Sequence, residues 1–122
     1  MRHADKVYYG RRTPNGCRVT KRFTDDAGHA RSIPLNPQLK LRNHSPDGFE
    51  WGYGGSGPAQ LALALLVDAV GDTRAGKVHA LAHYQTFKFE VVARLARDEW
   101  ELSHEAIKEW LDKKLVEAPR VG

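Results

Sequence analysis

The sequence predicts an α+β fold in which a small antiparallel sheet packs against about three helices. Two observations predict the sheet: a hairpin signal near position 15 and an alternating aromatic segment near position 51. A nearly all-apolar stretch followed by two amphipathic stretches predicts the helices. We expect the 122 residues to form one domain, 1–122, with residues 1–53 mainly strand and loop and residues 58–116 mainly helical.

Two strands, Lys6–Arg12 and Cys17–Phe23, are predicted on either side of the turn Thr13-Pro14-Asn15-Gly16. Proline presets the backbone for a turn, and Asn-Gly accepts the positive φ that a tight hairpin requires. Arg18 and Arg22 alternate with Cys17, Val19 and Phe23, so the two arginines should face outward. Either Arg11 or Arg12 should lie beside them on the first strand.

The next segments predict a short strand at Ala30–Ile33 and an irregular, proline-containing loop at Pro34–Gly48 that packs against the body. The Phe49–Tyr53 segment has the clearest strand pattern, because its aromatic residues alternate with Glu50 and Gly52. We therefore place Phe49–Tyr53 in the sheet together with the hairpin.

Three helices are predicted in the second half of the chain. Ala59–Val70 is apolar nearly all round, which is typical of a helix at the centre of a fold, and Gly71 ends it. Val78–Arg97 is expected to form the second helix. The third should begin after Ser103 as its N-cap residue and run to about Leu115. These last two helices resemble a helix-turn-helix, but the near-neutral surface of the third argues against DNA recognition.

A glycine-rich turn separates the predicted Phe49–Tyr53 strand from the first helix, and its spacing is G-x-G-x-x-G from Gly52 to Gly57. In a dinucleotide-binding unit an acidic residue would close a second parallel strand, whereas Asp72 directly follows the helix. A P-loop would continue with Lys and Ser or Thr, but Pro58 and Ala59 stand there. Both nucleotide-binding motifs are therefore rejected.

We interpret this turn as a sharp bend that lets a buried helix lie close to the segment before it. The alternative is an anion nest of backbone amides at the helix start, which would bind a phosphate or nucleotide. Its residues would be Gly54, Gly55, Ser56, Gly57, Ala59 and Gln60. Ser56 lies in a sequence similar to a nucleophile elbow, but Pro58 replaces the last glycine and no His/Asp pair is evident. No catalytic residue and no cofactor are predicted.

His79 and His83 are weak candidates for a metal site, because side chains four residues apart on a helix can chelate one ion. The H-E-x-x-H pattern of metalloproteases is absent, since position 80 is alanine. His44 and Glu50 are further candidates only if the fold brings them within reach of this pair. We therefore predict no metal site.

Charge is distributed unevenly along the chain. Residues 1–48 contain ten Lys/Arg and four Asp/Glu, which gives +6, and residues 49–122 contain nine and eleven, which gives −2. This asymmetry favours an acidic partner, either protein or nucleic acid. The partner-binding residues predicted from it are Arg11, Arg12, Arg18 and Arg22. With a single cysteine, Cys17, no signal-peptide pattern and no long apolar run, we expect a cytoplasmic protein that does not bind membranes.

The segment Phe49-Glu50-Trp51-Gly52-Tyr53-Gly54-Gly55-Ser56-Gly57-Pro58-Ala59-Gln60-Leu61-Ala62 resembles the signature of a family of domains of unknown function, DUF6166. The resemblance extends from the Tyr8-Tyr9-Gly10 strand to the Trp110-Leu111 helix. Members occur in bacteria, archaea, phages and plasmids. The resemblance implies no known activity, cofactor or catalytic residue, and only by association does it imply an accessory role such as counter-defence.

Together these observations predict a small non-enzymatic binding protein, encoded by a phage or another mobile element, that acts on a macromolecular partner through its basic hairpin. Two alternatives stay open. One is a phosphate- or nucleotide-binding protein that uses the glycine-rich turn, and the other is a DNA- or RNA-binding regulator. The sequence does not indicate whether the protein forms homo-oligomers.

Overall fold

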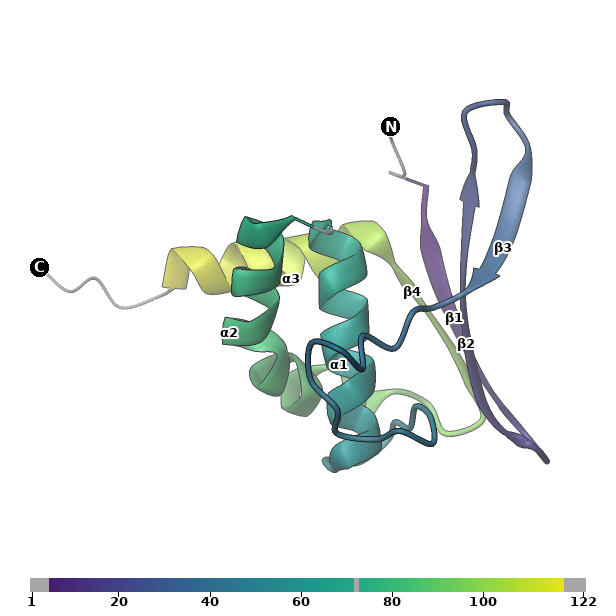
Figure 1. Ribbon diagram of the computed structural model, residues 1–122, viewed down its shortest axis with the longest axis horizontal. Helices are drawn as coiled ribbons and strands as arrows, with labels where there is room; N and C mark the ends of the chain where they lie inside the picture. The colour runs from purple at the N-terminus through teal and green to yellow at the C-terminus, as the bar shows by residue number, and fades with distance from the viewer. Residues whose placement is uncertain (1–4, 72, 118–122) are drawn as a thin grey trace, which may run out of the picture.

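The computed structural model describes residues 5–71 and 73–117 and contains a four-stranded antiparallel sheet beside three helices. The α+β class is therefore confirmed. The strands, in chain order, are β1 (Val7–Thr13), β2 (Gly16–Thr24), β3 (Ala30–Pro34) and β4 (Glu99–Ser103). They lie side by side in the order β3-β2-β1-β4. Figure 1 shows the helices together on one side of this sheet.

The helices are α1 (Ser56–Val70), α2 (Arg74–Glu90) and α3 (His104–Glu117), with a 3₁₀ turn at Val92–Arg94 after α2. As predicted, α1 ends at Val70, and Gly71 follows with a φ of 94°. Ser103 caps α3, because its Oγ accepts a hydrogen bond from the backbone N–H of Ala106. Residues of α1 are buried almost without exception, so this helix forms the centre of the core.

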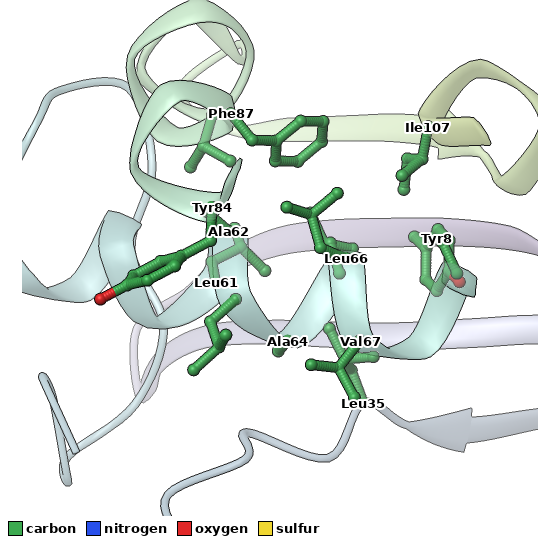
Figure 2. Packing of buried hydrophobic residues seen from close by; sticks show 14 of the residues in the cluster. Tyr8, Leu35, Leu61, Ala62, Ala64, Leu66, Val67, Tyr84, Phe87 and Ile107 are labelled. Carbon is green, nitrogen blue, oxygen red and sulfur yellow. The ribbon is translucent and has the colours of Figure 1, made fainter. Parts of the chain in front are cut away.

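The core fills the space between the inner face of the sheet and the helices. Figure 2 shows Leu66 of α1 pointing toward Phe87 of α2, while Val67 points toward Leu35 of the loop that follows β3. Leu35 is buried, which confirms that the Pro34–Gly48 loop packs against the body. Because the sheet, the other helices and the loop surround α1, this helix needs no solvent-facing polar side, as the sequence indicated.

The prediction of a strand at Phe49–Tyr53 is wrong. Gly52 has a φ of 86°, and its backbone N–H donates to the carbonyl of Val92 rather than to a strand. Trp51 is buried and donates its indole N–H to the carbonyl of Arg97, whereas Tyr53 is about half exposed. The aromatic alternation therefore reflects a buried anchor followed by an exposed turn, and not the two faces of a strand.

The fourth strand, β4, lies instead at Glu99–Ser103, inside the half of the chain expected to be helical. It pairs with β1, with Tyr9 opposite Glu101 and Gly10 opposite Trp100. The predicted helix at Val78–Arg97 is correspondingly shifted. It begins at Arg74, because the Thr73 hydroxyl caps it, and it ends at Glu90 before two β-branched valines.

Candidate functional site

The sheet has one face on the core and one face that no helix or strand covers within residues 5–71 and 73–117. We call this second surface the open face, and Figure 1 shows it on the side of the sheet away from the helices. An open hollow of about 530 Å³ lies on it. The side chains that define the open face belong to Tyr9, Arg11, Arg18, Thr20, Arg22, Glu99 and Glu101.

Three of the four predicted arginines, Arg11, Arg18 and Arg22, meet on the open face, and all three are exposed. Arg11 and Arg18 are direct cross-strand partners. No hydrogen bond or ion pair holds either guanidinium within the described part of the chain. Like charges directly opposite one another weaken a strand pair. The Arg11–Arg18 contact therefore opposes stability, although Glu99 on the other side of Arg11 offsets part of the repulsion, and both cations are accessible to a partner.

Arg22, unlike Arg11 and Arg18, packs against a neighbouring side chain of the open face. Its guanidinium carbon lies 4.1 Å from the centre of the Tyr9 ring, which is the geometry of a cation–π contact. Tyr9 stands in the middle of the face, opposite Thr20 on one side and Glu101 on the other. The sheet thus presents a stacked guanidinium and aromatic ring between its charged groups.

Acidic side chains occupy one edge of the same surface. Glu99 is the cross-strand partner of Arg11, and Glu101 is the partner of Tyr9. Both glutamates are exposed and line the hollow. The open face is therefore divided, with its positive charge on β1 and β2 and its negative charge on β4.

Arg12, the fourth predicted arginine, does not belong to the open face, because it points from β1 to the opposite side of the sheet. Its guanidinium forms an ion pair of 2.9 Å with Glu50 and lies 5.2 Å from the centre of the Trp51 ring. The hydrogen bond from Arg12 lowers the pKa of Glu50, while burial raises the pKa of the neighbouring Cys17 thiol. Strand alternation separates Arg12 from Arg11, which resolves the choice that the sequence left open.

The glycine-rich turn is closely packed by neighbouring side chains. A Cβ atom on Gly57 would lie 2.6 Å from the Cβ of Glu50, and one on Gly54 would lie 2.8 Å from the Phe89 ring. Gly55 is the N-cap residue of α1 and has extended backbone angles. The backbone N–H of Ala59 already donates to the carbonyl of Gly55. These contacts supply a packing reason for the glycines, as the structural interpretation of the turn requires.

Gln60, also predicted for the anion nest, is fully buried and fully bonded. Its side-chain oxygen accepts from the backbone N–H groups of His44 and Ser45. Its side-chain nitrogen donates to the carbonyls of Pro37 and Arg42. Gln60 therefore ties the Pro34–Gly48 loop to α1 and has no hydrogen-bonding capacity left for a ligand.

Replacing Gln60 by leucine is expected to destabilise the protein by about 3 kcal/mol, because it leaves buried loop amides and carbonyls without partners. Backbone amide exchange at positions 44 and 45 should accelerate more than exchange in the sheet. Hydrogen exchange measured by mass spectrometry tests this, with Gln85→Leu on exposed α2 surface as the matched control. Unchanged protection of the loop would contradict the role assigned to Gln60.

A second polar cluster, which the sequence analysis did not identify, lies between the sheet and the end of α1. The Asp68 carboxylate forms ion pairs with Lys6 at 2.7 Å and with Lys21, and it accepts a hydrogen bond of 2.7 Å from the Tyr8 hydroxyl. Burial by itself raises the pKa of Asp68, but these three donors outweigh it and hold the pKa below its usual value. Burial next to Asp68 raises the pKa of Tyr8. The cluster is a structural ion-pair network that joins β1, β2 and α1.

The histidines His79 and His83 have no third possible metal ligand placed beside them among the described residues. His79 is exposed on α2 and His83 is partly exposed, and His44 bonds through its Nε2 to the Tyr84 hydroxyl. Across the described residues, no group of three or more His, Cys, Asp or Glu side chains is placed to hold a metal ion. Nor does any helix within those ranges have the length and apolar character needed to cross a membrane.

Three residues of the open face were missed by the sequence analysis: Tyr9, Glu99 and Glu101. A signal existed for each. Tyr9 is two residues before Arg11 and therefore shares its face, and the two glutamates alternate with Trp100 and Leu102 as they would in a half-buried strand. Strand β4 is only five residues long and is followed at once by α3, so its period-2 pattern is too short to distinguish a strand from a turn between two helices.

The fold and the surface define a small α+β domain with a sheet that is covered on one face and charged on the other. Comparison with protein families places it further. The chain belongs to the family of unknown function DUF6166, whose model matches residues 8–113. No curated protein and no solved structure matches the chain.

Proposed function

We propose that the protein is a non-enzymatic binding protein that holds an acidic macromolecule against its open face and thereby occludes or regulates that partner. The observation that carries the proposal is the group of three exposed arginines around one hollow, two of which, Arg11 and Arg18, form no ion pair in the described structure. Retaining Arg11 opposite Arg18 opposes stability, and a binding role is a physical reason for keeping the pair.

The division of charge supports the same proposal. A partner with acidic groups is attracted to the β1–β2 side and repelled by Glu99 and Glu101 on β4. Such a pattern orients the partner as well as attracting it. The arrangement therefore favours one orientation of the bound partner, whereas a uniformly basic patch would favour none.

Charge reversal at Arg18 is expected to weaken capture of a polyanion without weakening the fold. The Arg18→Glu variant places a carboxylate opposite Arg11, so its melting temperature should stay equal or rise slightly. Elution from immobilised heparin should require clearly less salt than for the wild type. The matched control is Arg74→Glu, which changes the net charge equally at an exposed position on α2. If the two variants elute at the same salt concentration, the open face is not the surface that binds the polyanion.

A second measurement identifies what the protein carries when it is purified gently from cells. The ratio of absorbance at 260 and 280 nm rises when nucleic acid co-purifies with a protein. We expect a raised ratio for the wild type and a normal ratio for Arg18→Glu. A co-purifying acidic protein with a normal ratio would retain the proposed binding function but assign it a protein partner.

A further inference from the structure

The stacked pair formed by Arg22 and Tyr9 points to a particular kind of acidic partner. Tyr9 is half-buried, and the exposed Arg22 guanidinium lies 4.1 Å from its ring centre. A guanidinium plane and an aromatic ring are both surfaces on which nucleobases stack. We propose, resting on the function proposed above, that the open face binds single-stranded nucleic acid, with a base stacked at the Tyr9–Arg22 pair.

Cationic groups lie at one end of this stacking surface. Arg11 and Arg18 form one row of the sheet, whereas the Arg22 guanidinium lies over the Tyr9 ring and is part of the stacking surface. Every base within a single strand has a phosphate on either side of its sugar. A strand that stacks one base at Tyr9 therefore directs the phosphates on one side of that base toward the Arg11–Arg18 row.

The glutamates favour a single strand over a duplex. Glu99 and Glu101 line the same hollow as the arginines. A duplex laid across the face would bring the phosphates of its second strand toward these carboxylates, and its bases would be stacked on each other rather than available to Tyr9. A single strand that follows β2 keeps its phosphates away from these carboxylates. The amino groups of the exposed bases can donate hydrogen bonds to the glutamate carboxylates.

An acidic polypeptide fits the surface less completely. Its carboxylates would pair with Arg11 and Arg18, but they would leave the aromatic surface at the centre of the face unused. Stacking contributes to single-strand binding independently of base identity, because every base has a π-face. The combination of stacking surface and flanking cations is thus accounted for by a nucleic acid strand and only partly by a peptide.

Fluorescence anisotropy with labelled 12-nucleotide thymidine and adenosine deoxyoligomers tests this inference on the full chain. We expect both strands to bind at low salt, and the matching duplex to bind more weakly. Tyr9→Val should weaken single-strand binding about tenfold or more, whereas Tyr9→Phe, which keeps the ring, should bind like the wild type. The logarithm of affinity against the logarithm of salt concentration should fall with a slope of about −1.4 if Arg11 and Arg18 neutralise two phosphates.

Two further variants test the inference without changing Tyr9, in case substitutions at position 9 weaken the fold. Arg22→Gln removes the exposed half of the stacked pair at a solvent-facing site and should also weaken single-strand binding about tenfold. Arg74→Glu should leave binding unchanged. Thermal unfolding of each variant shows whether a loss of binding reflects a loss of fold.

The same variants distinguish this inference from the broader function. Poly-L-glutamate, labelled in the same way, serves as the peptide-like polyanion. If it binds and is lost in Arg18→Glu, while neither oligonucleotide binds or responds to Tyr9→Val, the nucleic acid inference is overturned and the proposed binding function stands. If no polyanion responds to Arg18→Glu, both are overturned.

Discussion

Replacing Gly10 by alanine is expected to lower the melting temperature of the protein by about 10 °C, which corresponds to about 3 kcal/mol. Gly10 lies on the inner face of β1, opposite Trp100 of β4. A Cβ atom at this position would lie 2.1 Å from the Trp100 indole, so the ring would have to move. The indole cannot move freely, because it packs edge-to-face on the buried Trp51.

Differential scanning calorimetry measures this effect, and two other variants isolate its cause. Gly28→Ala introduces a Cβ with open space around it but at a φ of 83°, so it reports the cost of backbone strain alone, about 1 kcal/mol. Combining Gly10→Ala with Trp100→Leu should be less destabilising than the sum of the two single changes, since the smaller side chain makes room. A Gly10→Ala melting temperature equal to the wild type would contradict the close packing described above.

Replacing Asp68 by asparagine is expected to destabilise the protein by about 3 kcal/mol at neutral pH. The change removes the only carboxylate that pairs with Lys6 and Lys21 in the described structure, and the Lys6 side chain is only 8% exposed. Breaking a buried ion pair by removing one partner leaves an uncompensated charge, which accounts for the size of the effect. Urea unfolding measures it, and Glu90→Gln, which disturbs a partly exposed ion pair between α2 and Lys114 of α3, should have a much smaller effect.

The pH dependence of the same variant follows from the lowered pKa of Asp68. A carboxylate whose pKa is lower in the folded state stabilises the fold fully above its ordinary pKa of 3.8, and this contribution is lost as the pH falls through the folded value. The difference in unfolding free energy between wild type and Asp68→Asn should therefore be constant from pH 5 to 7 and shrink below pH 4. A difference that persists unchanged at pH 2 would show that the carboxylate charge is not what stabilises the cluster.

Elements that depend on local sequence signals were predictable, whereas features that depend on tertiary contacts were not. The hairpin turn, the apolar character of α1 and the Ser103 cap are local, and each predicted its element. The aromatic alternation at residues 49–53 is also local, yet it misled, because burial of Trp51 against the carbonyl of Arg97 depends on a segment 46 positions away. Strand β4 likewise acquires its role only through pairing with β1.

The residues of the open face could likewise be predicted only in part from the sequence. Period 2 predicted that Arg18 and Arg22 share a face, but only the register between β1 and β2 decides that Arg11 rather than Arg12 joins them. Two polar residues in the apolar helix, Gln60 and Asp68, were signals of a different kind. A lone amide or carboxylate in a buried helix requires partners, and the sequence could have predicted that need without identifying the partners.

The position of β1 between β2 and β4 has a consequence for how the chain folds. Its β2 side can pair as soon as the first hairpin exists, but its β4 side waits until the 85 intervening residues, 14–98, have been traversed. Until β4 pairs and α3 packs behind it, the apolar surface of α1 lacks part of its cover, and such intermediates are prone to aggregate. Contacts this distant also slow folding. Shortened chains that end before Glu99 should therefore accumulate as insoluble material rather than as smaller folded units.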